Sequence, residues 1–203
     1  MSTTSLGVLL VAIAYASGSV PYGLVLTRIF LGVDVRTVGS GNIGGTNVAR
    51  VNKKLGVATI LLDILKAVIP LLVAQRLLAG RPRGDLWVMG VAVAAFVGHC
   101  YTIFLRFKGG KGVASAFGIY LVLSPALALA GVACWAGIAL TLRMSSLGSL
   151  AGTLVCVFGM IITRGLGSPL TWSVIVVGAI IFWKHRENIR RIVSGEEKTK
   201  MKV

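Results

Sequence analysis

Long uncharged stretches alternate with short polar segments along the whole chain. A helix of about 20 residues, at a rise of about 1.5 Å each, crosses the hydrocarbon core of a bilayer. The first stretch, from Met1 to Thr27, has no charged side chain and lacks the basic start and short apolar core of a signal peptide. We therefore predict an all-α integral membrane protein with a retained first helix at about 6–27. The other apolar runs occupy residues 55–76, 86–105, 112–142, 144–163 and 165–183.

The run at 112–142 is too long for one crossing. Its 31 residues would make a helix of about 46 Å, whereas the hydrocarbon core is about 30 Å thick. Ser124-Pro125 lies inside it, and the residue before a proline resists the helical conformation. We predict a short or broken helix near 112–123, followed by a second helix.

The basic residues indicate the topology. With the amino terminus outside and seven transmembrane helices, 16 of the 21 Lys and Arg residues lie in inner segments. If 112–142 were a single helix, the seven basic residues of the carboxyl-terminal segment would lie outside. The cytoplasmic excess of Lys and Arg favours seven helices, a cytoplasmic carboxyl terminus and one transmembrane domain over 1–203. The basic residues then left outside are Arg76, Arg81, Arg83 and Arg164.

Composition excludes a water-soluble globule. The chain is 56% hydrophobic and 13% charged, with a mean hydropathy of +0.88, whereas soluble domains have about a quarter of their residues charged. The net charge of +15 is typical of nucleic-acid binding. Here the basic residues lie between apolar runs, so we assign them to membrane orientation and expect no nucleic acid.

The few ionisable and sulfur-containing side chains inside the apolar runs have structural interpretations. Cys100, Cys134 and Cys156 lack metal-ligand spacing, so we expect small buried hydrophobes and no metal site. Asp63 and Lys66 are spaced i, i+3 and share a helix face. We interpret them as a buried ion pair that holds helices together, with a direct catalytic role as the alternative.

A Gly-rich segment at 38–50 follows the first helix. It contains Gly39-x-Gly41-x-x-Gly44, but the dinucleotide fingerprint requires a strand before it and a βαβ unit around it. Because both neighbours are membrane helices, we reject that reading. Glycines still let backbone N–H groups approach an anion, and Arg50 offers a bidentate fork to a phosphate. The alternative is a flexible turn without a site.

A second polar segment consists of Gly98-His99 and the stretch 108–114. Its Gly-Gly-Lys-Gly is not a Walker loop, because Leu105 stands where glycine is required and Gly112 follows the lysine. A Gly-rich turn with two lysines before a short helix nevertheless suits a phosphate. The alternative is a topology signal alone.

The third segment, at 183–191, ends the last apolar run. His185 and Asn188 are i, i+3 neighbours, and a histidine near the interface can transfer a proton at neutral pH. For Arg190, Arg191 and the lysines beyond them we prefer a solvated end that contacts anionic lipid. Serines at 145–149 are more often helix caps than ligands. In the seven-helix topology all these segments face the cytoplasm, which points to an anion site there.

Together, residues 40–47, residues 98–99 with 108–114, and residues 185–189 closely resemble the three signature stretches of the bacterial acyl-phosphate:glycerol-3-phosphate acyltransferases. The resemblance covers nearly the whole chain. Gly45 stands where alanine is usual in that family, and Tyr101-Thr102 replaces a usual Phe-Pro. Because Thr102 stands in place of the proline, the local helix shape there can differ from that of the family.

The resemblance implies a seven-helix enzyme of the bacterial plasma (inner) membrane with its site facing the cytoplasm. Its partners are acyl phosphate, glycerol 3-phosphate and membrane lipid, and it needs no cofactor. Its products in phospholipid biosynthesis are 1-acyl-glycerol 3-phosphate (lysophosphatidate) and phosphate. Ser146 is the alternative to Ser149 as a contact. The resemblance carries over Ser40, His185 and Asn188 as catalytic, and Gly41, Asn42, Gly44, Thr46, Asn47, Arg50, Lys111 and Ser149 as substrate-binding.

Two alternative functions and two candidate general bases remain to be weighed. A small transporter or flippase for a phosphorylated metabolite or lipid is the main alternative, and a structural membrane subunit is the third. Transporters often have internal repeats and a midplane site, and the chain has no evident repeat. His185 is our candidate base, with a substrate phosphate oxygen as its rival. Neither histidine is followed five residues later by Asp, so we expect acyl phosphate rather than acyl-CoA as the donor.

Overall fold

A computed structural model describes residues 1–197, and this part of the chain consists of helices and their connections. The all-helical prediction is therefore confirmed. Four helical stretches are long and apolar enough to cross a membrane, namely Thr3–Leu31, Lys53–Leu78, Gly84–Leu105 and Ser145–Arg164, and three shorter helices are equally apolar. In chain order the elements are α1 Thr3–Ser19, α2 Tyr22–Leu31, η1 Val35–Thr37, α3 Gly45–Val48, α4 Lys53–Leu78, α5 Gly84–Cys100, η2 Ile103–Leu105, α6 Val113–Leu123, α7 Pro125–Thr141, α8 Ser145–Arg164, α9 Pro169–Lys184 and α10 Arg186–Val193.

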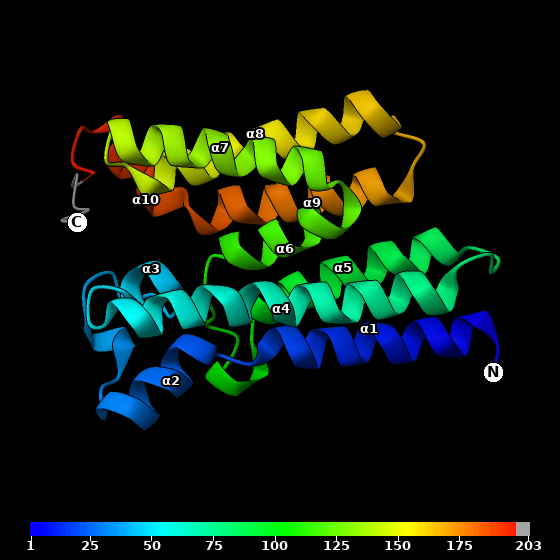
Figure 1. The fold of residues 1–203 in the computed structure, drawn as a ribbon, viewed down its shortest axis with the longest axis horizontal. Helices are drawn as coiled ribbons and strands as arrows, with labels where there is room; N and C mark the ends of the chain where they lie inside the picture. Colours follow the sequence, from blue (N-terminus) through cyan, green and yellow to red (C-terminus); the bar gives the residue numbers. More distant parts are fainter. Residues whose placement is uncertain (198–203) are drawn as a thin grey trace.

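The helices form two halves joined by a short central helix. Helices α1, α4 and α5 pack together in one half, and α7, α8 and α9 in the other. Helix α6 lies between them and contacts α4, α7 and α9 (Figure 1). This arrangement brings α4, α6, α7 and α8 around one common space.

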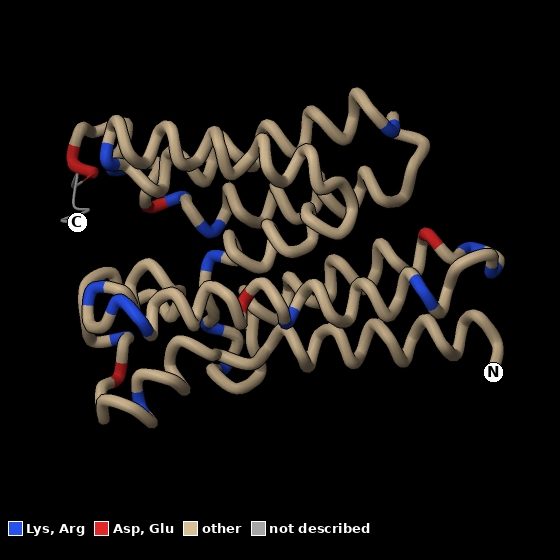
Figure 2. The backbone as a smooth tube through the Cα atoms, in the orientation of Figure 1, with Lys and Arg blue, Asp and Glu red and all other residues tan. Residues whose placement is uncertain are grey.

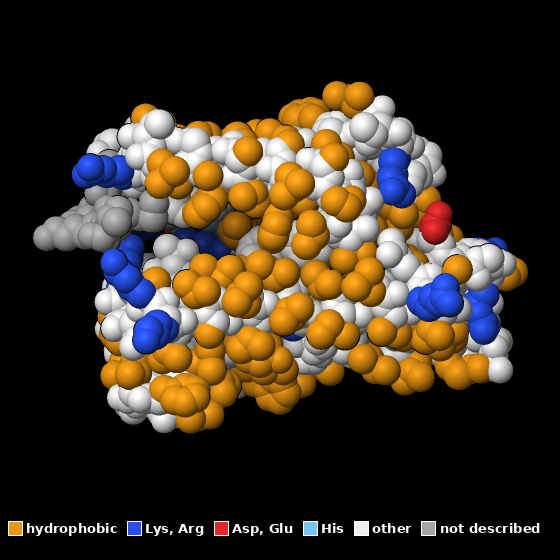
Figure 3. Space-filling model, in the orientation of Figure 1, with side chains coloured by type: hydrophobic (Ala, Val, Ile, Leu, Met, Phe, Trp, Pro, Cys, Tyr) orange, Lys and Arg blue, Asp and Glu red, His pale blue; other side chains and the backbone are white. Residues whose placement is uncertain are grey.

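Lys and Arg gather at the two ends of the helices, and apolar side chains cover the length between them (Figures 2 and 3). One end carries α3 and α10 and all the Gly-rich segments. The connections α4–α5 and α8–α9 lie at the opposite end. The four arginines assigned to the outside are in the α4–α5 connection (Arg81, Arg83) and in the last turns of α4 (Arg76) and α8 (Arg164). The uncertain residues 198–203, with their three lysines, lie outside the described part.

The first apolar run is broken, which corrects the prediction of one helix over 6–27. Helix α1 ends at Ser19 and α2 begins at Tyr22. Pro21 lacks an N–H donor and forces Val20 into an extended conformation (φ −62°, ψ 118°). The break redirects the chain into α2 and the Gly-rich loop.

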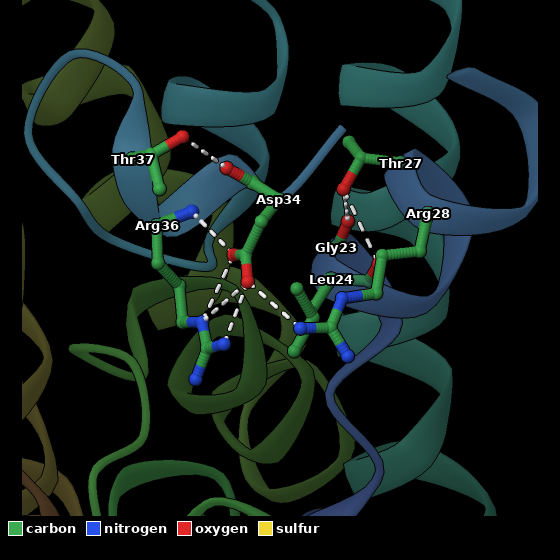
Figure 4. A network of polar contacts seen from close by, with 7 residues as sticks. All are labelled: Gly23, Leu24, Thr27, Arg28, Asp34, Arg36 and Thr37. Carbon is green, nitrogen blue, oxygen red and sulfur yellow. Dashed lines mark hydrogen bonds and ion pairs between the residues drawn. The ribbon is translucent and has the colours of Figure 1, made fainter. Parts of the chain in front are cut away.

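A cluster of charged residues fixes the corner after α2. The Asp34 carboxylate accepts hydrogen bonds from Arg28 (2.8 Å) and from Arg36 Nε (2.9 Å), and also caps η1 by accepting from the Arg36 N–H (Figure 4). Thr27 Oγ1 donates back to the carbonyl of Gly23 (2.9 Å). The two arginines lower the pKa of Asp34, so the corner keeps its charge pattern at neutral pH.

The break predicted within 112–142 is confirmed. Helix α6 has 11 residues, which is about 16 Å of helix. Ser124 is extended (φ −158°, ψ 91°), and Pro125 opens α7.

The last apolar run ends within one residue of the predicted bound, 183. Helix α9 stops at Lys184, and a separate helix α10 begins at Arg186. The His185 N–H is shared between the carbonyls of Ile181 and Phe182, so the last turn tightens and the chain turns there.

Candidate active site

One cavity of about 520 Å³ collects the polar segments. It lies between the two halves, and the molecule is visibly hollowed there, at the end that carries α3 and α10 (Figure 3). Ten of the eleven predicted site residues line it: Ser40, Asn42, Gly44, Thr46, Asn47, Arg50, Lys111, Ser149, His185 and Asn188. Gly41 is the exception, because it lines a neighbouring cavity on the other side of the loop.

The Asn47 side chain organises the Gly-rich loop. Its Nδ2 donates to the carbonyls of Val35 (3.1 Å), Val38 (2.9 Å) and Asn42 (2.9 Å). Its Oδ1 accepts from the Ser40 N–H at 3.0 Å. Asn47 is buried, and both ends of its amide are occupied by loop backbone. The structure therefore gives Asn47 a loop-ordering role, where the resemblance implied a substrate contact.

The cationic side chain of the Gly-rich segment, Arg50, is not engaged by other side chains of the loop. The Arg50 side chain has no hydrogen bond or ion pair among residues 1–197, and it lines the cavity together with Ser40, Asn42 and Thr46. A guanidinium with five unused donors suits a phosphate. The unusual Gly45 has a local reason, because a Cβ there would overlap Ile60 Cγ1 and lie 2.7 Å from the Gly56 carbonyl.

A second group of polar residues lies across the cavity. Lys111 Nζ donates to Asn188 Oδ1, and Asn188 Nδ2 donates to Glu197 Oε1 at 2.7 Å. Arg191 forms an ion pair with Glu197 Oε2 at 2.7 Å and remains 43% exposed. Burial lowers the pKa of Lys111. Burial raises the pKa of Glu197, but hydrogen bonds from Ser146, Asn188 and Arg191 outweigh it and hold that pKa below its usual value.

His185 is buried at the junction of α9 and α10. Its Nδ1 lies 2.8 Å from the carbonyl oxygen of Ile181. Only a protonated Nδ1 can donate to a carbonyl, so this contact assigns the proton to Nδ1 and leaves the Nε2 lone pair available. Burial lowers the pKa of His185 to about 4. The imidazole is therefore neutral at pH 7, and a backbone carbonyl orients it in place of a carboxylate.

The two candidate serines on α8 both line the cavity with their protons already engaged. Ser149 Oγ donates to the carbonyl of Ser145 (2.8 Å), and Ser146 Oγ hydrogen bonds to Glu197 Oε1 (2.6 Å). Ser149 thus retains acceptor capacity, whereas Ser146 is tied to the carboxyl-terminal segment.

Sequence reasoning did not place Asp63, His99 or Glu197 among the site residues, although all three line the cavity. Asp63 and Lys66 form the predicted buried ion pair, with Nζ and Oδ1 2.7 Å apart. His99 Nδ1 lies 3.6 Å from the same Asp63 oxygen, and both Asp63 and His99 face the cavity. No spacing in the sequence connects residues 63 and 99, because α4 and α5 bring them together only in the fold.

One region of the wall is largely apolar. Helices α4, α6 and α7 contribute Ile64, Phe117, Tyr120, Val132 and Trp135 to it. The cavity therefore combines a cationic end with an apolar region, as an amphiphile with a charged head requires. Among residues 1–197, no group of three His, Cys, Asp or Glu side chains could hold a metal ion.

Comparisons with known proteins agree with this geometry. The family model described as glycerol-3-phosphate acyltransferase matches residues 8–195. A glycerol-3-phosphate acyltransferase of Anaeromyxobacter sp. (strain Fw109-5) is 57% identical over 98% of each chain. One from Geobacter sulfurreducens is 47% identical over 93% of this chain and 95% of its own.

Two solved structures of similar fold are also described as a glycerol 3-phosphate acyltransferase. The crystal structure of PlsY (YgiH), an integral membrane glycerol 3-phosphate acyltransferase, in its glycerol 3-phosphate form has a TM-score of 0.88 and 39% identity, covering 95% of this chain and 94% of its own. Its lysophosphatidic acid form has a TM-score of 0.86 and 38% identity. With its apolar helices, this likeness makes the chain a multi-pass membrane protein.

Proposed function

The chain belongs to the glycerol-3-phosphate acyltransferase family, and from this premise we propose that it transfers a fatty acyl group from acyl phosphate to glycerol 3-phosphate. The observation that carries the proposal is the single cavity that joins a cationic end to an apolar wall. Both substrates have a phosphate that the cationic end can bind. The donor also has an acyl chain that can lie against the apolar wall. The products are lysophosphatidate and inorganic phosphate.

The proposed chemistry needs positioning more than acid catalysis. The glycerol 3-phosphate hydroxyl attacks the acyl carbonyl, the new C–O ester bond forms, and the bond to phosphate breaks with its electron pair on the leaving phosphate. Arg50 and Lys111 hold the phosphates and offset their charge. His185 Nε2 accepts the hydroxyl proton, while Ser40 and Asn188 orient the reacting groups.

We also propose one domain over residues 1–203 with seven crossings and the cavity open to the cytoplasmic side of the bacterial inner membrane. Three short apolar helices in addition to the four long stretches supply seven candidate segments. The imbalance of Lys and Arg between the two ends supports this orientation. Cysteine labelling at positions 45, 110, 147 and 195 tests it, because labelling of any of these from outside would contradict the orientation.

Phosphate release by purified protein tests the activity directly. We expect release from acyl phosphate only when glycerol 3-phosphate is present, with lysophosphatidate formed in equal amount. Acyl-CoA supplied as the donor should give little or no product. Efficient use of acyl-CoA, or movement of glycerol 3-phosphate across vesicles without acyl transfer, would overturn the proposal.

The pH dependence of kcat separates the two candidate bases. A general base must be unprotonated to accept a proton. Because its pKa is lowered to about 4, His185 stays unprotonated down to about pH 4. If His185 accepts the proton, kcat should stay level between about pH 8 and pH 5, and His185→Ala should lower it about 10²–10⁴-fold. If the substrate phosphate is the base, kcat should fall near pH 6, because the second pKa of a phosphate monoester is about 6.

A further inference from the structure

A second cavity lies behind the Gly-rich loop and takes no part in the proposed reaction. Its volume is about 580 Å³, within the range of about 300–1,000 Å³ typical of ligand sites. Arg36, Gly41 and Ile43 line it from one side, and the turn 104–109 lines it from the other. The turn is anchored there by Leu105, which packs against the small core formed by α2, η1 and α3.

The second cavity is basic. Arg36, Arg106 and Lys108 are among its lining residues, and no acidic side chain is. The Arg36 guanidinium is held in place by Asp34, through Nε at 2.9 Å and Nη2 at 2.6 Å (Figure 4). Arg106 and Lys108 form no ion pair within residues 1–197. The cavity therefore has two unneutralised cations beside one fixed guanidinium, which suits a phosphate.

The turn that carries these cations is held in an unusual conformation. Arg106 and Phe107 are consecutive non-glycine residues with positive φ, 51° and 62°. Thr102 stabilises this turn: its carbonyl accepts the Phe107 N–H at 2.9 Å, and its hydroxyl donates to the Ser19 carbonyl at 2.5 Å. Strained backbone of this kind persists where the surroundings impose it, and it is concentrated at functional sites.

Exposed apolar side chains surround the basic cavity. Phe104 and Phe107 are each 60% exposed, and on α2 Ile29 is 70% and Phe30 65% exposed. A soluble anion would make no use of these side chains. A ligand with a phosphate and acyl chains would use both features, and basic pockets beside membrane helices are typical sites for lipid headgroups.

We propose that the second cavity binds the phosphate of an anionic membrane phospholipid, whose acyl chains lie against Phe104 and Phe107. The Gly-rich loop is the wall that this lipid site shares with the reaction cavity. Gly41 lines the lipid site, while its neighbours Ser40 and Asn42 line the reaction cavity. A bound lipid would thus support the loop from behind.

Native mass spectrometry of the purified protein in detergent tests the proposal without relying on enzyme activity. The probes are phosphatidylglycerol, phosphatidylcholine, which has the same phosphodiester without net charge, and inorganic phosphate. The variants are Arg106→Gln and Arg106→Gln/Lys108→Gln, with Lys54→Gln, at the start of α4, as a matched control for loss of an exposed cation. Circular dichroism verifies the helical content of each variant.

We expect the wild type to retain one tightly bound phosphatidylglycerol that phosphatidylcholine does not replace. The double variant should bind that lipid about 30-fold more weakly, Arg106→Gln should have a smaller effect in the same direction, and Lys54→Gln should have none. Equal retention of the two lipids, or unchanged binding by the folded Arg106→Gln variant, would overturn the proposal. Displacement of the lipid by millimolar inorganic phosphate would also overturn it, because the site would then belong to a soluble anion.

Discussion

Asn47→Asp is the sharpest test of how the Gly-rich loop is ordered. The substitution keeps the Oδ1 acceptor used by the Ser40 N–H but removes the two protons that Nδ2 shares among three backbone carbonyls. Two lost hydrogen bonds are worth about 1–3 kcal/mol, and the carboxylate also repels those carbonyl oxygens. We expect the ordered loop to lose about 2–3 kcal/mol, which corresponds to about 30- to 150-fold in its population.

The assay is steady-state phosphate release by the purified variant at several concentrations of glycerol 3-phosphate. Because substrate binds the ordered loop, the loss should appear mainly as a higher KM. Asn52→Asp is the matched control. The Asn52 side chain only accepts, from the Leu55 N–H at 3.1 Å as the N-cap of α4, and aspartate caps a helix equally well.

Two results would refute this reasoning. Wild-type kinetics for Asn47→Asp would show that the amide protons do not order the loop. A fall in kcat with an unchanged KM would indicate that Asn47 acts on the reacting groups in the transition state rather than on the order of the loop.

Three further substitutions test other parts of the site. Lys111→Ala should cost about 2–5 kcal/mol in kcat/KM, because it leaves substrate charge unpaired, whereas the exposed Lys53→Ala should leave phosphate release unchanged. Gly110→Ala should lower activity, since its methyl group would overlap the imidazole of His99, while Gly137→Ala has open space and should be silent in the same assay. Asp63→Asn should lower the free energy of unfolding by about 3–5 kcal/mol by leaving a buried cation unpaired, and an unchanged melting temperature would contradict that.

The sequence predicts the helices well because each membrane crossing requires a long run of apolar residues, which can be recognised directly. Apolar runs of sufficient length locate α4 and α8 to within two residues of the observed bounds, and the Ser124-Pro125 break follows from proline sterics. The break at Pro21 obeys the same rule, yet it was missed because the predicted helix at 6–27 has the length of a single crossing, so no excess length indicated a break. Hydropathy gives the length of an apolar run but does not show where the chain changes direction within it.

The site is predictable to the extent that its residues lie in short polar segments. Those segments supply ten of the residues around the reaction cavity. Asp63 and His99 escaped assignment because their proximity depends on the packing of α4 against α5. Glu197 was not predicted as a site residue because no sequence pattern distinguishes a single acidic residue in a basic segment. In the fold its carboxylate accepts hydrogen bonds from Asn188 and Arg191.

The buried ion pair has a second task that explains its position. Where α1 breaks, the Val20 carbonyl loses its i+4 helical partner and keeps one backbone hydrogen bond, from the Tyr22 N–H at 3.1 Å. Within a bilayer, the remaining acceptor capacity of such a group is best satisfied inside the protein. Lys66 Nζ donates to that carbonyl at 2.9 Å while it pairs with Asp63 at 2.7 Å. Lys66→Met should therefore destabilise the break at Pro21 even when paired with Asp63→Leu, which removes the unpaired charge. A double variant as stable as the wild type, measured by thermal unfolding, would show that the ion pair does not support the broken helix.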